Sequence, residues 1–306
     1  KIEIAFLTER DARQLRNHLL AAAGGMRSSA DAPPQVAESP ELRSLTVPVE
    51  RLLGSIALSG GAITVVLVVI AIVVAIAVTG EAGVALAFVP VILGAGGVLW
   101  QQFTRGFDFR IGVGADGLRL RHGLLEQRTQ SVPTGRVQAV RLHQPLLWRV
   151  TGWWQVQVNV AGYGLARSSD GSVTGSTVLP VGTLDEAFTV LTSIVPSLPH
   201  DPLLIAGSGA DAGFTAAPCR ARWVDPVGWR RHGFLVTEHA LLLRGGRLRR
   251  QLDVVPHART QSCAVWQGPL QRRMGLASFE LHSTPGLIVP RCDHLSSSVA
   301  ADLLVH

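Results

Sequence analysis

Charged residues are absent from a long part of this 306-residue sequence: none lies between Arg51 and Glu81, and only 16% of the chain is charged. Such a composition is too apolar for an ordinary soluble protein. Residues 56–78 form a run of 23 residues, of which 14 are Ile, Leu or Val. As a helix this run covers roughly 35 Å, against a hydrocarbon core of about 30 Å. We therefore expect it to cross a membrane.

Other absences exclude several kinds of chemistry. Three widely spaced cysteines, Cys219, Cys263 and Cys292, argue against a disulfide framework and for a reducing compartment. The ten histidines contain no H-E-x-x-H pair, and no C-x-x-C is present. The G-x-G-x-x-G match at residues 112–117 precedes an expected strand, which favours an Asp-Gly turn, and Ser208 lacks the spacing of a nucleophile elbow. We therefore expect no enzyme, no metal site and no cofactor.

A second uncharged stretch, residues 82–104, follows the first after a minimal turn. It contains Pro90 and several glycines, which neighbouring helices tolerate in a bilayer. The two stretches predict a transmembrane helical hairpin over residues 51–105. Four arginines flank it: Arg43, Arg51, Arg105 and Arg110. The turn carries only Glu81, so the positive-inside rule places both soluble ends in the cytoplasm.

One motif occurs twice, 123 positions apart. The repeated residues are Val132, Pro133, Arg136 and Gln138, which recur as Val255, Pro256, Arg259 and Gln261. Each copy continues into a Pro-Leu turn and a basic stretch that ends in glycine. Such a repeat indicates that one module is present twice.

Alternating apolar residues and Asp-Gly or His-Gly turns predict a β-meander in each copy. Strands are expected at 107–113, 118–121, 124–132, 137–142, 153–160 and 177–181 in the first copy, and at 234–237, 241–244, 247–255, 277–283 and 287–289 in the second. A helix closes each copy: one begins at Thr183 and Glu186 and runs to Val195, the other covers residues 293–305. Residues 1–23 have the pattern of a last strand and closing helix.

The expected organisation follows from these elements. It comprises the end of an upstream module (1–23), a linker (24–50), the hairpin (51–105), a first complete module (106–196), a second linker (197–232) and a second complete module (233–306).

Three stretches carry a resemblance to a known family: D-G-L-R-L-R-H-G-L-L at 116–125, V-P-T-G-R-V-Q at 132–138 and Q-P-L-L-W-R-V-T-G at 144–152. They resemble bacterial pleckstrin-homology-like (PH-like) membrane proteins, over most of residues 107–195 and more loosely over 233–305. The resemblance implies a membrane α-helical hairpin plus repeated α+β, mainly β, PH-like domains. Each domain is then a bent antiparallel sheet or small barrel closed by a C-terminal helix. The second copy departs from the first, since it has Gly268 where the first has Gln144 and lacks a preceding hairpin.

The net charge is +6, and nearly all the positive charge is arginine. Near an anionic leaflet each such arginine contributes about 1 kcal/mol of attraction, whereas the alternative is a solvated face with a positive-inside bias. Nucleic acid is not an expected partner, because no recognition helix or stacking platform is predicted. Trp148 either fills a small β-core or, with Arg141 and Arg149, contacts headgroups or another domain. The candidate membrane-surface or partner contacts are Arg141, Trp148, Arg149, Arg220, Arg222, Trp223, Trp229, Arg230, Arg231, Arg272 and Arg273.

The resemblance implies an integral protein of the bacterial cytoplasmic membrane with its soluble domains on the cytoplasmic side. Relatives resemble binding and assembly subunits of cell-envelope complexes, including complexes that respond to envelope stress. The expected partners are lipids of the anionic inner leaflet, a smaller membrane protein with a related PH-like domain, and further copies of the chain. The alternative is a component of a lipid or small-molecule transport or flipping system.

Overall fold

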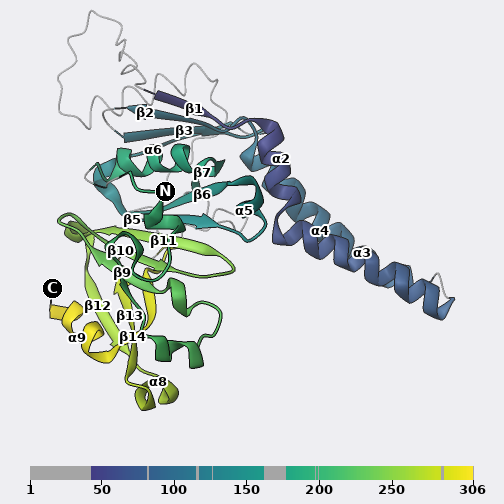
Figure 1. Cartoon of the computed structure of the whole chain (residues 1–306). Helices are drawn as coiled ribbons and strands as arrows, with labels where there is room; N and C mark the ends of the chain where they lie inside the picture. Colours follow the sequence, from purple (N-terminus) through teal and green to yellow (C-terminus); the bar gives the residue numbers. More distant parts are fainter. Residues whose placement is uncertain are drawn as a thin grey trace, which may run out of the picture. The chain divides into compact units, whose positions relative to one another are not determined.

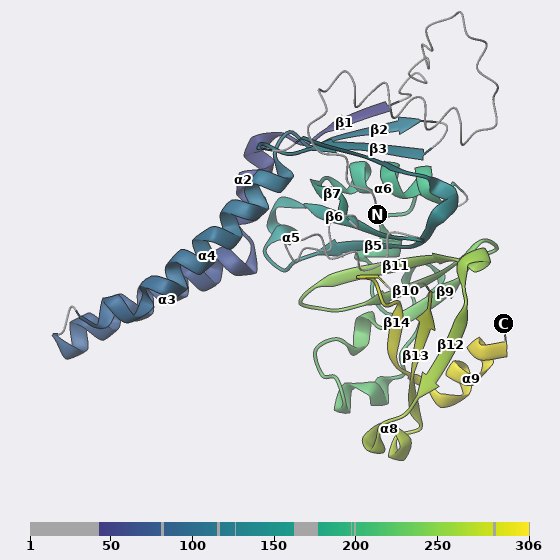
Figure 2. The same cartoon turned by 180° about the vertical axis from the view of Figure 1, so that it is seen from behind.

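The computed structural model describes residues 43–80, 83–114, 117–125, 127–161, 177–196, 198, 200–283 and 286–305. Figure 1 shows the elements in sequence colours, and Figure 2 shows them from behind. The strand and helix expected within residues 1–23, and the expected linker as far as residue 42, lie outside the described residues.

Three helices form the apolar part of the described chain: α2 (Val49–Ala57), α3 (Gly60–Thr79) and α4 (Val84–Gly106). The Ser59 hydroxyl accepts a hydrogen bond from the N–H of Ala62 where α3 begins, and Gly80 ends α3 in the left-handed conformation. α3 and α4 lie side by side in both views (Figures 1 and 2). One helix of the described residues, α3, is long and apolar enough to cross a membrane. Ile72 is the buried residue of α3, and its other apolar side chains are partly or fully exposed.

The first copy begins with a four-stranded antiparallel sheet, in the order β1-β2-β3-β4. These strands are β1 (Arg43–Thr46), β2 (Arg110–Gly114), β3 (Gly117–His122) and β4 (Arg128–Val132). The helical hairpin is therefore an insertion between the first and second strands. The copy continues with the 3-10 helix η1 (Thr134–Arg136), β5 (Val137–Gln144), α5 (Trp148–Thr151), β6 (Trp154–Val160), β7 (Thr177–Gly182) and α6 (Leu184–Ile194).

The second copy repeats this order, which confirms the duplicated module. Its first four strands are β8 (Thr215–Ala216), β9 (Gly233–Val236), β10 (Ala240–Gly245) and β11 (Arg250–Pro256). After them come η5 (His257–Arg259), β12 (Ser262–Trp266), α8 (Pro269–Arg273), β13 (Leu276–His282), β14 (Arg291–Ser296) and α9 (Ser297–Val305). The 123-residue offset of the sequence motif also relates β3 to β10 and η1 to η5.

The two copies share one sheet. β5 of the first copy pairs antiparallel with β11 of the second, which gives a seven-stranded sheet in the order β7-β6-β5-β11-β10-β9-β8. β12, β13 and β14 form a separate three-stranded sheet. The sheets are antiparallel, as expected, and none of those in the described residues closes into a barrel.

Each copy has its own apolar core, and the shared sheet lies between them. Phe188 of α6 belongs to the first core and Phe279 of β13 to the second, and both are fully buried. The cores also exchange residues across the sheet, because successive side chains of a strand point to opposite faces. Leu252 and Val254 of the second copy pack into the first core, whereas Ala139 of the first copy packs into the second.

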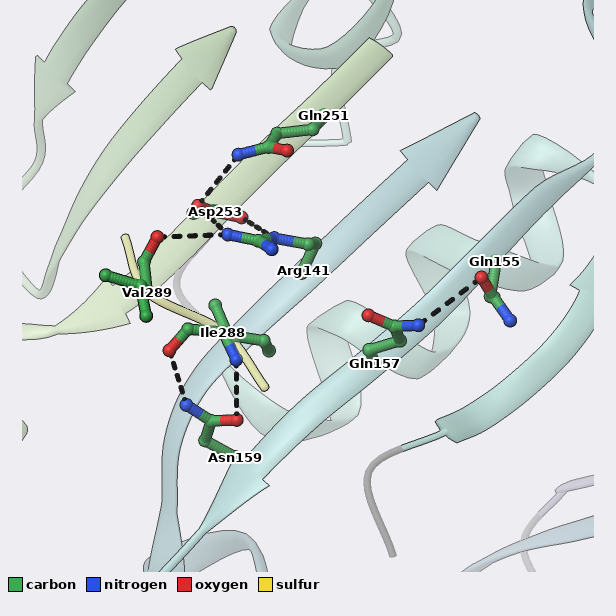
Figure 3. Close-up of polar contacts among 8 residues, drawn as sticks. All are labelled: Arg141, Gln155, Gln157, Asn159, Gln251, Asp253, Ile288 and Val289. Carbon is green, nitrogen blue, oxygen red and sulfur yellow. Dashed lines mark hydrogen bonds and ion pairs between the residues drawn. The ribbon is translucent and has the colours of Figure 1, made fainter. Parts of the chain in front are cut away.

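A buried ion pair joins the copies at the β5–β11 seam (Figure 3). Arg141 Nε and Nη2 donate to the two carboxylate oxygens of Asp253 at 2.6 and 2.8 Å, and Nη2 also donates to the carbonyl of Val289 at 3.1 Å. Complete burial raises the pKa of the Asp253 carboxyl, against the opposing effect of Arg141. Beside this pair, the Asn159 amide donates to the carbonyl of Ile288 at 2.7 Å and accepts from its N–H at 3.1 Å. The Arg141–Asp253 pair therefore favours one register of the seam, and Asn159 adds a second polar contact between the copies.

Both expected linkers contain elements of the fold. β1 lies in the linker expected over residues 24–50, and it pairs with β2 from the far side of the hairpin. The linker expected over 197–232 contains β8, the helix α7 (Leu203–Ala206) and three 3-10 helices, of which η3 (Cys219–Trp223) and η4 (Trp229–Arg231) follow β8. These segments are short and rich in Gly, Ala or Pro, so their sequences show no periodic apolar pattern. Their strands form by pairing with strands further along the chain, which the sequence pattern does not reveal.

The last part of the second copy also differs from expectation. Residues 287–289 are not a strand, and the closing helix begins at Ser297 rather than at residue 293. The strand β14 occupies residues 291–296 instead, and of its side chains only Cys292 and Leu295 are buried. β12 was not predicted, because none of its side chains is fully buried and its sequence does not alternate clearly. The first closing helix is as predicted: Thr183 and Glu186 form a capping box on α6.

Replacing Arg141 by Met leaves the Asp253 carboxylate buried without its cation, and we expect the free energy of unfolding to fall by about 3–5 kcal/mol. The double variant Arg141→Met/Asp253→Leu removes both charges and is expected to recover most of that loss. Denaturant unfolding of the purified chain in mild detergent measures both changes. Equal losses in the single and double variants would contradict this account of the seam.

Candidate site at the hairpin end of the shared sheet

Helix α2 connects the hairpin to the first copy by close packing. Trp148 Nε1 donates to the carbonyl of Ser55 at 3.1 Å, which satisfies a carbonyl near the C-terminal end of α2. A Cβ on Gly54 would lie 2.7 Å from the ring of Trp153, so glycine at this position permits the close approach of α2 to that ring. Helix α2 therefore packs closely against the first copy.

An ion pair adds to this attachment. Arg51 Nη1 of α2 donates to Glu186 Oε2 at 2.6 Å, and the same oxygen accepts from the N–H of Thr183 at 2.7 Å. One carboxylate thus caps α6 and binds α2. Both ionic side chains are about a quarter exposed, so solvent screening limits what the pair adds to stability.

Helix α5 leads from this attachment to the second copy. Arg149 Nη2 donates to the carbonyl of Arg247 in the turn between β10 and β11. Apolar side chains are exposed on both segments: Val150 of α5 is 89% exposed and Leu248 of the turn is 61% exposed. Arginine and exposed apolar residues therefore lie together next to the helix that begins the hairpin.

Helices η3 and η4 occupy the position in the second copy that the hairpin occupies in the first, between the first two strands. Six of the eleven candidate residues lie on this segment. Arg222 lies over the Trp223 ring and Arg230 over the Trp229 ring, each with the guanidinium carbon 5.4 Å from the ring centroid. Trp223 is 71% exposed, and Arg230 is also exposed. The segment therefore presents arginine and tryptophan on its surface.

The buried member of that segment is Arg231. It donates to three consecutive carbonyls at the end of α7, those of Ile205, Ala206 and Gly207, at 2.6, 3.0 and 2.7 Å. Cations are favoured at such ends, where the last carbonyls of a helix lack partners.

The structure divides the remaining candidates between interior and surface. Arg141 belongs to the seam, and Trp148 is buried against α2, which is the core role rather than a surface contact. Arg220 donates to the carbonyl of Gly275 and to the Ser296 hydroxyl, at 3.1 and 3.0 Å. Arg272 and Arg273 are exposed on α8. The eleven candidates therefore do not form one site.

Two further arginines complete a cluster that the sequence did not reveal. Arg244 is fully buried, with its guanidinium carbon 4.1 Å from the Phe214 ring centroid, and it donates to the carbonyl of Gly209 at 2.6 Å. Arg250 donates to Gln144 Oε1 at 3.3 Å. We call Arg149, Arg231, Arg244 and Arg250 the arginine cluster. In the sequence, only Arg244 gave an indication of this cluster, because it is a charged residue at the end of an otherwise apolar strand.

The alignment of the two copies is also corrected here. Gln144 Nε2 donates to the carbonyl of Trp153 at 3.1 Å, and Gln267 Nε2 donates to the carbonyl of Leu276 at 2.9 Å. Because both bonds are related by the same 123-residue offset, Gln267 rather than Gly268 is the counterpart of Gln144. The described residues contain no group of acidic, histidine or cysteine side chains that could hold a metal ion.

These features define a class: a protein of duplicated PH-like modules in which an apolar hairpin interrupts the first sheet. The chain belongs to the Bacterial PH domain family, whose model matches residues 51–194 and again 187–304. Proteins with this domain are typically membrane-associated bacterial proteins. A search of curated proteins gave no match to the chain.

Replacing Trp148 by Phe keeps most of the buried ring but leaves the carbonyl of Ser55 without its donor. We expect the free energy of unfolding to fall by about 1–3 kcal/mol. The matched control, Trp223→Phe, changes a ring that is mostly exposed and should leave stability within about 0.5 kcal/mol of the parent. Thermal or denaturant unfolding in detergent tests both variants, and equal effects would contradict the attachment through α2.

Proposed function

We propose that the protein is a binding and assembly subunit of a cell-envelope complex in the bacterial cytoplasmic membrane. The observation that carries the proposal is the β5–β11 pair, since one PH-like module of this chain already binds another through a strand edge. Main-chain pairing of this kind gives affinity, while side chains such as Arg141 and Asp253 give register. A fold that joins two of its own modules in this way is suited to joining a module of another polypeptide.

The edge for such a partner is β12. It is the counterpart of β5 in the repeat, and within the described residues it pairs with β13 alone. Ser262 and Trp266, at its two ends, are exposed. An open strand edge favours pairing with another chain. The proposed occupant is the fourth strand of a PH-like module, in a smaller membrane protein of the same family or in a second copy of this chain.

The proposed topology has two crossings, one by α3 and one by α4, with the PH-like modules on the cytoplasmic side. α4 has 23 residues, and its one charged residue, Arg105, lies in its last turn. Exposed arginines beside the hairpin would then face the anionic inner leaflet, where each basic residue contributes about 1 kcal/mol of attraction. This arrangement supports membrane lipids as additional partners.

A cysteine at the turn of the hairpin tests this topology. We expect Thr79→Cys to react with a membrane-impermeant maleimide on intact cells, because the turn lies outside the cytoplasm in the proposed arrangement. Native Cys219 is exposed and lies on the other side, so it is the internal control that reacts only after lysis. Mass spectrometry of the labelled protein separates the two sites. Labelling of residue 79 only after lysis contradicts the topology.

Lysine on β12 tests the assembly edge, because a charge on an edge strand opposes pairing. We expect Ser262→Lys/Trp266→Lys to reduce the amount of co-purified partner protein, or of dimer, at least about tenfold. Leu270→Lys is the matched control, since Leu270 is an exposed apolar residue of α8 and takes no part in strand pairing. Gentle detergent extraction followed by native mass spectrometry gives the stoichiometry. A parent chain that is monomeric and without a protein partner contradicts the proposal.

A further inference from the structure

The arginine cluster places four guanidinium groups near one another at one end of the shared sheet. Arg244 of β10 pairs with Leu252, so it lies on the same sheet face as Leu252 and Arg250 of β11. Arg149 reaches this region from α5 and Arg231 from η4. Like charges on adjacent strands are destabilising, so this arrangement needs a compensating interaction.

The described residues offer carbonyl oxygens to the cluster rather than carboxylates. Arg231 and Arg244 direct their terminal nitrogens at carbonyls, as described above, and Arg149 also donates to a carbonyl. In the described part of the chain, none of the four forms an ion pair with Asp or Glu. Asp211 opposes the effect of burial on Arg244, since its charge raises the pKa that burial lowers. Carbonyl dipoles satisfy hydrogen bonds, but they leave the net positive charge in place.

Two independent observations show that the compensation is incomplete. The Nε atoms of all four arginines are buried and have no hydrogen-bond partner. Burial, together with repulsion from Arg250, Arg244 and Arg149, lowers the pKa of Arg231 to about 9. Burial and the neighbouring Arg250 and Arg247 likewise lower the pKa of Arg149. Because an arginine side chain keeps its charge in a folded protein, the buried charge costs folding free energy.

We propose that the arginine cluster binds a phosphate group, either as a phosphomonoester or as a phosphodiester. Arg149 and Arg250 are its ligands, because their guanidinium groups are the less buried ones and keep donors that the carbonyls do not use. Arg231 and Arg244, the more buried members of the cluster, stabilise the anion through their positive charge. A phosphate matches this set, since it combines one to two negative charges with several acceptor oxygens and fits the planar guanidinium fork.

The site lies beside the attachment of the hairpin, because Trp148, next to Arg149, donates to Ser55 of α2. A lipid headgroup at the membrane surface and a free phosphate in the cytoplasm both supply the required chemistry. The inference does not depend on the proposed partner protein, whose edge, β12, lies in another sheet.

The test uses the full chain in neutral detergent and phosphate-free buffer, with Tm measured against inorganic phosphate at constant ionic strength set by sodium chloride. We expect phosphate to raise Tm by at least about 2 °C more than chloride does, because a ligand of the native state stabilises it. Arg149→Gln and Arg250→Gln should lose this increment. In phosphate-free buffer both variants should unfold at or above the Tm of the parent, since each relieves repulsion. Arg272→Gln/Arg273→Gln, on α8, is the matched control and should keep the increment.

A second arm identifies the source of the phosphate. The same proteins are placed in nanodiscs of phosphatidylcholine with or without phosphatidic acid. Stabilisation by inorganic phosphate supports a site for the free anion, whereas stabilisation by phosphatidic acid alone supports a site for a lipid headgroup. The proposal is overturned if neither probe stabilises the parent beyond its control, or if the variants at Arg149 and Arg250 respond as the parent does.

Discussion

The pairing of β5 with β11 is the interaction on which the rest of the described structure depends. It makes one seven-stranded sheet from two modules, and each face of that sheet then covers a different core. Because Leu252 and Ala139 are exchanged across the sheet, neither core is complete without the other copy. At this seam Asp253 is fully buried and Arg141 is largely buried. A shift in register would therefore separate a buried charge from its partner.

The sequence was sufficient for the elements that carry a periodic or repeated signal. The 123-residue repeat predicted two modules, the uncharged run predicted α3, and Thr183 with Glu186 predicted the start of α6. The sequence did not predict β1, because its pairing with β2 spans the whole hairpin. It also did not predict that β5, which pairs with β6 of its own copy on one side, pairs with β11 on the other, since edge pairing depends on backbone groups that every residue has.

The candidate site was only partly predictable for a related reason. Arginines near tryptophans indicated a surface, and Arg222, Arg230, Arg272 and Arg273 are exposed. Clusters in sequence did not show which arginines meet in space, so Arg231 was grouped with exposed neighbours although it caps α7 inside the protein. Arg244 and Arg250 belong to strands, and only the register of β10 against β11 shows that their side chains share a face.

The attachment of α2 has a mechanical consequence. Trp148, Gly54 and the Arg51–Glu186 pair attach this helix to the first module, and α3 begins only two residues after α2 ends. A hairpin in a bilayer adjusts its tilt to the local hydrocarbon thickness. In the proposed topology, this attachment would convert a change in hairpin tilt into rotation of the two-module body, so the orientation of its loops would follow the thickness of the surrounding membrane.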